Sequence, residues 1–437
     1  MFKPVSWNAL SRAQQDSLLK RPVQRQEHDF TCRVQRVINE VRKTGDKAIR
    51  SFTKQFDKVD IENLKVREAE FDAAMRQVPS SAIEAFAHVV KHLTAFHRQQ
   101  RLPDYAIETS PGILCEQAAR PIQRVGLYVP AGSAPLVSTV LMLGVPSQLA
   151  GCPLRILCSP PDNAGNIDPN ILVAARLSGI DTIFKVGGAQ AIAAMAYGTE
   201  SVPKVDKIFG PGNRWVTTAK MLVSLDPNGA LLDMPAGPSE VLVVADDRAN
   251  PSVVAADLLS QAEHGEDSQV LLICISQDFA QKVLREIDNQ LKSLSRAAVA
   301  RQSLQNSILI VVDGVVEAIA IANQYAPEHL ILQIADPREY LPEIHSAGSV
   351  FLGDWTPESA GDYASGTNHV LPTYGFARSC SGLSVRDFIK TVTVQELTRD
   401  GLVSIAETIR ILTGIEGLDA HQHAIDIRLQ STGVHDG

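Results

Sequence analysis

The chain has 437 residues, of which 45% are hydrophobic and 21% are charged. This is ordinary globular usage, and the length predicts two to four domains. The formal net charge of −8 at pH 7 disfavours a general nucleic-acid-binding protein, which would carry a basic patch or stripe.

The first 15 residues contain no continuous apolar core after their lysine, so we do not expect a signal peptide. No apolar run in the sequence approaches the roughly 20 residues of a membrane span. The six cysteines form no CxxC pair. We therefore expect reduced thiols in a cytoplasmic protein that binds neither a membrane nor nucleic acid.

Residues 1–100 are predicted to be mainly helical. Apolar residues recur at helical spacing in residues 30–51 and again in residues 68–97. Residues 104–120 then change to a β-like pattern, with Ile107 and Ile113 among small and polar side chains.

From about residue 121 the order strand, glycine-containing turn and helix occurs three times. The three turns are PAGSAP (130–135), GGAQ (187–190) and GPGN (210–213). This order is typical of a parallel, doubly wound sheet, and such turns place helix N-termini at one edge, where phosphates bind. No G-x-G-x-x-G is present, and many glycines only make tight turns, so each loop alone is weak evidence.

A second alternation of strands and helices begins at residues 240–245 and continues to residues 349–352. From Val385 onward the chain is predicted to be mostly helical. The predicted fold class is therefore α/β, with two Rossmann-like doubly wound sheets, a helical N-terminal segment and a small helical C-terminal tail.

Glu328 and His329 follow Pro327 between a predicted helix, residues 315–325, and a predicted strand, residues 330–334. An adjacent carboxylate and imidazole can divide labour, one activating water and the other moving protons near neutral pH. Most charged loop residues are only solvated, and this junction by itself favours that plainer interpretation.

A metal site is a further hypothesis. Gln261 and His264 lie three apart near the end of a well-capped predicted helix, so they share a face. Oxygen and nitrogen donors without thiolate suit zinc with open positions. The other candidate ligands, Asp362 and His369 and one of His421 and His423, are far away in the sequence. Spacing does not choose between His421 and His423.

A series of longer motifs runs along the chain in a fixed order. They are VGLYVPAGSAPLVSTVLM (125–142), VGGAQAIAAMAYGT (186–199), GPGN (210–213), GPSEVLV (237–243), LLSQAEHG (258–265), APEHL (326–330), AGDYASGTNHVLPT (360–373), SGLSV (381–385), TVQELT (393–398) and EGLDAH (416–421). In this order they resemble the histidinol dehydrogenase family essentially from end to end. Departures are small, such as Ala131 where a glycine is common and Cys380 where the family varies.

The resemblance implies roles for individual residues of this sequence. The acid/base pair would be Glu328 and His329. The zinc ligands would be Gln261, His264, Asp362 and His421. Substrate contacts would be made by Ser239, His369, Glu416, His329 and the same four zinc ligands. Dinucleotide contacts would be made, one from each glycine loop, by Tyr128, Gln190 and Asn213.

The resemblance also implies an activity, the oxidation of L-histidinol to L-histidine through L-histidinaldehyde, with two NAD+ and one water consumed. This is the last step of histidine biosynthesis. The implied cofactors are NAD and one zinc ion per subunit. The implied partner is a second copy of the chain in a homodimer, in which Glu416 and His421 complete the partner's site.

The fold implied by the resemblance is aldehyde dehydrogenase-like, with four parts. They are an N-terminal helical segment that packs with the tail (1–25), a first Rossmann-like domain with the zinc and catalytic residues (26–126 plus 239–383), an inserted NAD-binding domain (127–238) and a helical tail exchanged between subunits (384–437).

Alternative functions fit parts of the pattern. The scaffold could serve another NAD-dependent amino-alcohol or aldehyde dehydrogenase. A thiol-dependent aldehyde oxidation would use Cys115, Cys152 or Cys158 as nucleophile, but none has an adjacent histidine. A zinc hydrolase would use Glu328 with metal-bound water and would not need the glycine loops. A non-catalytic metabolite- or metal-binding protein would not need the Glu328–His329 pair.

Overall fold

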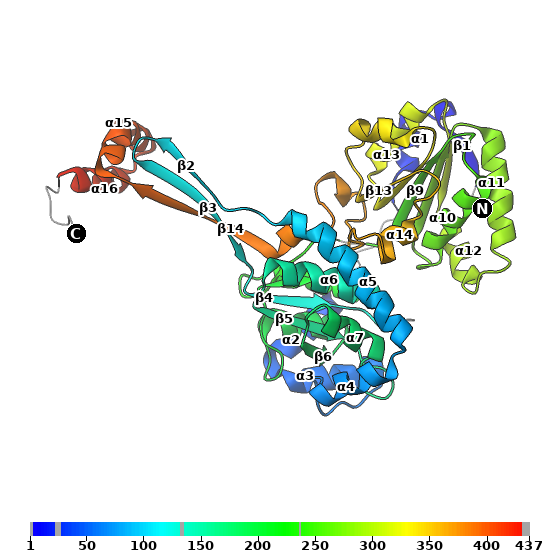
Figure 1. Cartoon of the computed structure of the whole chain (residues 1–437), viewed down its shortest axis with the longest axis horizontal. Helices are drawn as coiled ribbons and strands as arrows, with labels where there is room; N and C mark the ends of the chain where they lie inside the picture. Colours follow the sequence, from blue (N-terminus) through cyan, green and yellow to red (C-terminus); the bar gives the residue numbers. More distant parts are fainter. Residues whose placement is uncertain (1–2, 22–27, 132–134, 236, 431–437) are drawn as a thin grey trace. The chain divides into compact units, whose positions relative to one another are not determined.

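The computed structural model describes residues 3–21, 28–131, 135–235 and 237–430 (Figure 1). The chain divides into two compact units, Met1–Gln100 with Ile122–Phe388, and Arg101–Pro121 with Ile389–Gly437. Residues 132–134 of the first glycine turn, and residues 1–2, 22–27, 236 and 431–437 of the predicted domains, lie outside the described residues. Within the described residues, no helix combines the length and apolar character that a membrane span requires.

The first unit contains a five-stranded parallel sheet with strand order β6-β5-β4-β7-β8. Its strands are β4 (Arg124–Tyr128), β5 (Leu154–Ser159), β6 (Thr182–Lys185), β7 (Lys207–Phe209) and β8 (Leu231–Leu232). The helices that pack around it are α2 (His28–Thr44), α3 (Asp46–Phe52), α4 (Glu68–Gln77), α5 (Ser80–His97), α6 (Val137–Ala150), α7 (Pro169–Leu177), α8 (Gly188–Tyr197) and α9 (Arg214–Ser224). Helices α2, α3, α8 and α9 share one core on this sheet, and α5, α6 and α7 pack together beside it (Figure 1).

The N-terminal helices differ from the prediction in their limits and in their packing. Residues 68–97 form two helices rather than one, because Pro79 separates α4 from α5. Residues 30–51 are likewise divided at Gly45, which has φ +54°. The apolar face of α2, with Val34, Ile38 and Val41, is buried in the core of the β4–β8 sheet. The prediction groups residues 26–126 with residues 239–383, but this apolar face lies on the other sheet.

The first unit also contains a six-stranded parallel sheet with order β1-β11-β10-β9-β12-β13. Its strands are β1 (Pro4–Ser6), β9 (Glu240–Ala245), β10 (Gln269–Cys274), β11 (Ile308–Val311), β12 (His329–Gln333) and β13 (Ser349–Leu352). Its helices are α1 (Arg12–Leu18), α10 (Pro251–Ala262), α11 (Gln277–Gln290), α12 (Ala297–Gln305), α13 (Val315–Tyr325) and α14 (Glu358–Tyr363). Two parallel sheets of this kind confirm the predicted fold class.

Side chains of the central strand β9 alternate between two cores. Val241 and Val243 pack with α10, α11 and α12 on one face, and Leu242 packs with α13 on the other. Trp7 and Leu19 are buried in that second core, and β1 pairs with β11 at the edge of the sheet. The described part of residues 1–25 thus contributes β1 and buried apolar side chains to this sheet, and its packing with the tail stays a prediction.

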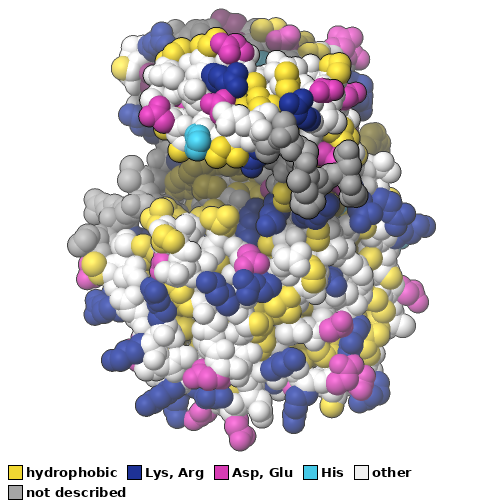
Figure 2. Space-filling model, turned by 90° about the vertical axis from the view of Figure 1, so that its left-hand side faces the viewer, with side chains coloured by type: hydrophobic (Ala, Val, Ile, Leu, Met, Phe, Trp, Pro, Cys, Tyr) yellow, Lys and Arg dark blue, Asp and Glu magenta, His cyan; other side chains and the backbone are white. Residues whose placement is uncertain are grey.

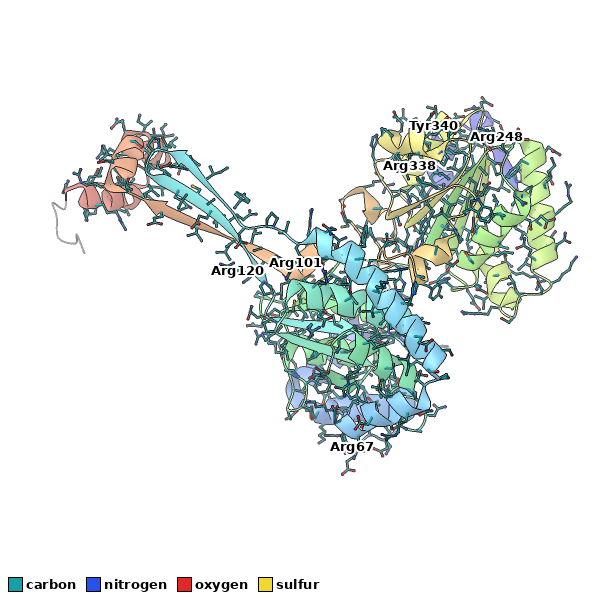
Figure 3. All side chains as sticks on the ribbon, viewed as in Figure 1. Arg67, Arg101, Arg120, Arg248, Arg338 and Tyr340 are labelled. Atoms are coloured by element: carbon teal, nitrogen blue, oxygen red, sulfur yellow. The ribbon has the colours of Figure 1, made fainter. Side chains whose placement is uncertain are left out.

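The second unit is a three-stranded antiparallel sheet of order β14-β3-β2 with two helices. Its elements are β2 (Tyr105–Ser110), β3 (Ile113–Pro121), β14 (Ile389–Leu397), α15 (Arg399–Glu416) and α16 (Asp419–Gln430). Arg101 and Arg120, labelled in Figure 3, belong to this unit. The tail is predicted to be mostly helical, and the strand β14 is missed.

Polar contacts support helices in both units. Arg410 of α15 donates two hydrogen bonds to Asp426 of α16, at 2.8 and 2.7 Å. Arg67, labelled in Figure 3, is the N-cap residue of α4, and its backbone N–H donates to Glu70 Oε2 at 3.0 Å. On the face shown in Figure 2, Lys and Arg side chains are interspersed with Asp and Glu.

Candidate active site

Glu328 and His329 lie where helix α13 passes into strand β12. Ala326, just past the helix, has φ +55° and turns the chain, so that β12 can begin at His329. Glu328 is 6% exposed and His329 is 3% exposed. The interpretation of the pair as solvated loop residues is therefore wrong. The pair lies at the amino end of β12, beside the amino ends of β9 and β13.

A buried ion pair supports the Glu328 side chain. The backbone N–H of Glu240 donates a hydrogen bond of 2.8 Å to Glu328 Oε2. The carboxylate of Glu240 accepts from Arg21 Nη2 at 2.8 Å and from the Tyr374 N–H at 3.1 Å. Arg21 also donates to the Tyr325 carbonyl at 3.0 Å. Burial raises the pKa of Glu328 to about 8, so this carboxylate is a stronger base than one in water.

His329 is surrounded by carboxylates. Its Nδ1 lies 3.1 Å from the Glu240 carbonyl oxygen and 3.7 Å from Glu358 Oε1. Its Nε2 lies 3.4 Å from Asp362 Oδ1. Burial opposes the charged imidazolium, but the carboxylates of Glu358, Glu328 and Asp362 outweigh it and raise the pKa of His329. The ring is therefore arranged to take up a proton.

A set of oxygen and nitrogen donors lies next to His329. Ligand atoms of His264, Glu358 and Asp362 are all within 4.8 Å of one another and could hold a metal ion. Gln261 is fully buried, and neither atom of its amide has a hydrogen-bond partner among the described residues. An unpaired buried amide is costly, and an oxygen donor toward a cation would relieve that cost. These residues fit a divalent metal such as zinc.

Glu358 was not predicted from the sequence. It is the first residue of α14 and precedes Asp362 by four residues, so the two carboxylates share one face of the helix. That spacing was the signal available in the sequence. Burial raises the pKa of Glu358 to about 8.

Next to these groups lies a cavity of about 180 Å³. The predicted site residues in its lining are Ser239, Gln261, His264, Glu328, His329, Asp362 and His369. His369 is held by Thr139 of α6, with Nε2 3.2 Å from Thr139 Oγ1, and by the Asp362 carbonyl, 2.9 Å from Nδ1. The structure therefore brings together every predicted catalytic, substrate and metal residue that lies in the first unit.

Glu416 and His421 belong to the second unit. Glu416 is the last residue of α15, His421 lies in the first turn of α16, and both are exposed. Their roles at the metal and at the substrate stay predictions.

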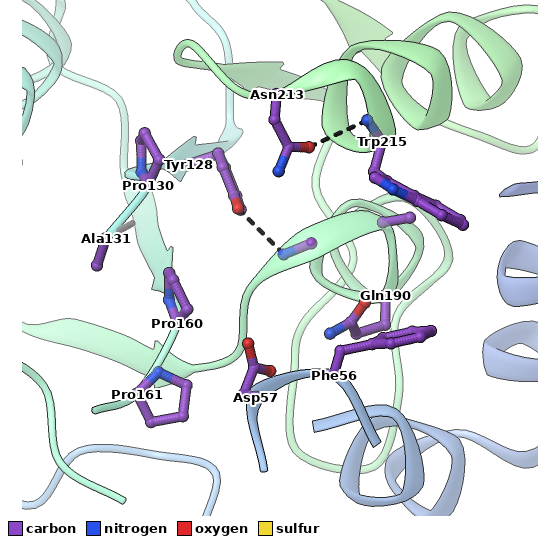
Figure 4. A pocket seen from close by; sticks show the side chains of 12 residues that line it. Phe56, Asp57, Tyr128, Pro130, Ala131, Pro160, Pro161, Gln190, Asn213 and Trp215 are labelled. Atoms are coloured by element: carbon purple, nitrogen blue, oxygen red, sulfur yellow. Dashed lines mark hydrogen bonds between the residues drawn. The ribbon is translucent and has the colours of Figure 1, made fainter. Parts of the chain in front are cut away.

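A second cavity, of about 390 Å³, lies at the carboxyl ends of β4, β5 and β6 (Figure 4). Tyr128, Gln190 and Asn213 line it, one from each glycine loop. The Tyr128 hydroxyl accepts a hydrogen bond of 3.0 Å from the Gly188 N–H, and Asn213 Oδ1 accepts from the Trp215 N–H at 3.0 Å. The predicted dinucleotide contacts thus share one pocket.

Residues that sequence reasoning did not single out complete this pocket. Phe56, Asp57 and Trp215 form part of its wall (Figure 4). Phe56 and Asp57 lie at the end of the π-helical turn Thr53–Asp57, about 70 residues before the first glycine loop. No local signal links that turn with the loops, because only the packing of α2 and α3 on this sheet brings them together.

Comparison with known proteins identifies the family. The family model described as histidinol dehydrogenase matches residues 19–429. The chain belongs to the histidinol dehydrogenase family.

Other relatives agree with this assignment over nearly the whole chain. The histidinol dehydrogenase of Vibrio parahaemolyticus is 52% identical over 429 residues, which are 98% of this chain and 99% of that protein. The histidinol dehydrogenase of Escherichia coli is 51% identical, with 98% of each chain covered. The crystal structure of histidinol dehydrogenase from Elizabethkingia anophelis has a TM-score of 0.94 and 48% identity, and 98% of each chain is covered. The histidinol dehydrogenase family is one of oxidoreductases, so the class of reaction follows from membership.

Proposed function

We propose that the chain oxidises L-histidinol to L-histidine through L-histidinaldehyde, with two NAD+ and one water consumed and two NADH formed, as the last step of histidine biosynthesis. One observation carries the proposal: the buried Glu328–His329 pair lines one cavity together with His264 and Asp362, whose ligand atoms lie within 4.8 Å of each other and of Glu358. A base, a proton carrier and a place to anchor a polar substrate are what such an oxidation needs.

Zinc is the metal that this donor set suits, with one ion per subunit. Gln261, His264, Asp362 and His421 would hold it, and Glu358 lies close enough to take part. When bound, the ion would orient the imidazole and amino nitrogens of histidinol and stabilise developing negative charge on oxygen.

His329 would accept the hydroxyl proton of histidinol as hydride passes to NAD+. Its Nδ1 side faces the Glu240 carbonyl and the carboxylate of Glu358, and these acceptors favour the protonated ring that forms. The aldehyde would stay in the cavity. His329 would act in the same way during the second hydride transfer.

Glu328 would deprotonate the water that attacks the aldehyde carbonyl. Its raised pKa suits a general base near neutral pH. The Glu240 N–H donates a hydrogen bond to one carboxylate oxygen of Glu328. This contact would fix the position of the second oxygen of Glu328 relative to the carbonyl carbon of the aldehyde. Ser239 and His369, which also line the cavity, would contact the substrate.

The NAD pocket would be the cavity lined by Tyr128, Gln190 and Asn213. Helices α8 and α9 begin at this cavity, at Gly188 and Arg214. Backbone N–H groups at helix N-termini bind phosphates, so the pyrophosphate of NAD would lie there.

We further propose that the enzyme is a cytoplasmic homodimer in which Glu416 and His421 complete the partner's site. Large apolar side chains are exposed on α15, where Ile411 is 56% and Ile415 is 78% exposed. Such side chains are typical of a surface that another chain covers.

Residues 127–238 would form the NAD-binding domain, and residues 239–383 would form the domain with the zinc and catalytic residues, without residues 26–126.

The alternative functions are disfavoured by particular observations. Cys152 and Cys158 are buried, and burial raises the pKa of the Cys152 thiol to about 11, so neither resembles an activated nucleophile. A zinc hydrolase would leave the second cavity without use. A non-catalytic binding protein would not need a buried carboxylate with a raised pKa next to the ligands. Another amino-alcohol or aldehyde would be distinguished from histidinol by its kcat/KM.

The test is the stoichiometry of the reaction. The purified protein is incubated with L-histidinol, NAD+ and zinc, and NADH and L-histidine are counted. Two NADH for each histidine are expected. Absence of NADH, or hydrolysis products in its place, would contradict the proposal.

A further inference from the structure

Asp57 is a charged side chain in the NAD pocket for which neither the fold nor the proposed reaction yet gives a role. It is the last residue of the turn Thr53–Asp57, and Lys58, with φ +62°, turns the chain away from the cavity. Among the described residues that line the cavity, Asp57 is the one with a charged side chain. Its place there follows from the packing of α3 against α8.

The carboxylate of Asp57 has an oxygen without a partner. Its Oδ2 is buried and makes no hydrogen bond among the described residues. Figure 4 shows the carboxylate pointing into the space between Pro160 and Gln190. Burial raises the pKa of Asp57 to about 6, so the group is largely ionised at pH 7 and above. A buried anionic acceptor of this kind is costly unless a hydrogen-bond donor reaches it from water or from a ligand in the pocket.

The two ends of the pocket have opposite character. Helices α8 and α9 begin beside Tyr128 and Asn213, and the positive ends of their dipoles favour phosphate. Asp57 comes from the turn Thr53–Asp57, and its carboxylate repels phosphate. Phe56 and Trp215 add flat aromatic side chains to the wall of the same pocket. A ligand that fits carries an anionic centre, an aromatic base and neutral hydroxyl donors, as the adenosine half of NAD does.

We propose that Asp57 determines the choice of dinucleotide, by accepting hydrogen bonds from the adenosine ribose hydroxyls of NAD and by repelling the 2′-phosphate of NADP. The inference rests on the proposed function, because it assigns the adenosine half of the cofactor to this cavity. An acidic side chain on the ribose hydroxyls is the general means by which dinucleotide folds select NAD. Here it comes from a turn outside the strand–turn–helix units, which is why sequence spacing did not reveal it.

The test compares Asp57→Asn and Asp57→Ser with the unaltered protein. Binding of ADP-ribose and of 2′-phospho-ADP-ribose is measured by calorimetry, and kcat/KM for NAD+ and NADP+ is measured with L-histidinol. Hydrogen bonds to a charged acceptor predict a loss of ADP-ribose affinity of roughly 10-fold to 100-fold in Asp57→Ser. The preference for NAD+ over NADP+ should fall at least ~10-fold in both variants. Unchanged affinities and an unchanged preference would overturn the inference.

Asp60→Asn is the matched control. Asp60 is exposed, lies three residues away, pairs with Lys54 and does not line the cavity, so the same change in charge there should leave both ligands unaffected. An equal effect of Asp60→Asn would show a general charge effect and would also overturn the assignment of Asp57.

Two further outcomes separate this inference from adenine recognition by Asp57 and from failure of the proposed function. If Asp57 contacts the adenine amino group instead, its effect will vanish with nicotinamide hypoxanthine dinucleotide, which lacks that group, and the ribose assignment is then refuted. If the protein forms no NADH from histidinol, the proposed function fails. The calorimetric comparison of the two ADP-riboses still decides the role of Asp57 in that case.

Discussion

At the scale of single residues, the site gathers carboxylates around one imidazole. His329 lies within 4 Å of oxygens from Glu328, Glu358 and Asp362. Each carboxylate is mostly buried, so mutual repulsion and desolvation favour sharing a proton or binding a cation. A zinc ion would supply the missing positive charge.

Glu358 is predicted to position His329. Removing its charge by Glu358→Gln should weaken the protonated state of His329 and lower kcat roughly 10-fold to 100-fold, with the KM for NAD+ unchanged. Steady-state kinetics with the zinc-loaded enzyme tests this. Glu343→Gln, at an exposed position, should behave like the unaltered enzyme. A normal kcat in Glu358→Gln would rule out the positioning role.

Metal removal is predicted to abolish activity. A chelator should remove the ion from the set Gln261, His264 and Asp362, and added zinc should restore both activity and a content of about one zinc per subunit. Asp362→Ala should lower the zinc content measured by atomic absorption after dialysis, whether or not it is active. Full activity in protein shown to be free of metal would refute the proposed zinc role.

At the scale of elements, the candidate site residues of the two sheets lie at opposite ends of the strands. The loops of the β4–β8 sheet that line the proposed NAD pocket follow the carboxyl ends of strands, as is usual in such folds. Glu328 and His329 instead lie at the amino ends of β9, β12 and β13. There the C-terminal end of α10 supplies Gln261.

Gly210 is predicted to be irreplaceable at the end of β7. It has φ +115°, and a Cβ there would collide with the carbonyl oxygen of Tyr128. Gly210→Ala should therefore reduce the free energy of unfolding by about 1 to 3 kcal/mol and weaken NAD binding. Thermal unfolding and calorimetry measure the two effects. Gly314→Ala is the control, because Gly314 has φ −172° and open space around it; equal behaviour of the two variants would contradict the steric argument.

The elements that sequence reasoning predicted are those with a strong local pattern. The buried strands β9, β10 and β12 are continuous apolar runs, and α10 has an N-cap residue, Asn250, whose side chain accepts from Ser252 N–H. The strands β1 and β14 were missed because their pairing partners, β11 and β3, are about 300 residues away in the sequence.

The site residues likewise divide into those that belong to a local sequence motif and those that do not. Residues carried by motifs, such as Glu328 and Gln190, line the cavities. Glu358 and Asp57 were not found, because only the tertiary fold brings Glu358 next to His329 and Asp57 into the pocket with Tyr128. The i, i+4 spacing of Glu358 and Asp362 was a local signal, but it does not reveal the contact with His329.

At the scale of the whole molecule, the proposed site is shared between subunits. Glu328 belongs to the first unit and His421 to the second. If His421 serves the partner, Glu328→Gln and His421→Ala should each form almost no L-histidine in steady state alone but complement one another in a mixed dimer. Only one of the two sites in such a dimer is intact.

Complementation can be measured after equal amounts of the two variants exchange subunits. Random pairing makes about half of the dimers mixed, so about a quarter of the normal activity is expected. Mixing either variant with itself is the control. Absence of any gain, with exchange verified by mass spectrometry of tagged subunits, would place His421 in the site of its own chain.

The most direct test of the central claim, that Glu328 activates water while His329 moves the substrate protons, is a single-turnover comparison of the two oxidations. Glu328→Gln is mixed with NAD+ and either L-histidinol or L-histidinaldehyde, and NADH is followed in time. The account predicts near-normal NADH formation from the alcohol and a loss of roughly 100-fold or more from the aldehyde. Equal losses from the two substrates would contradict it.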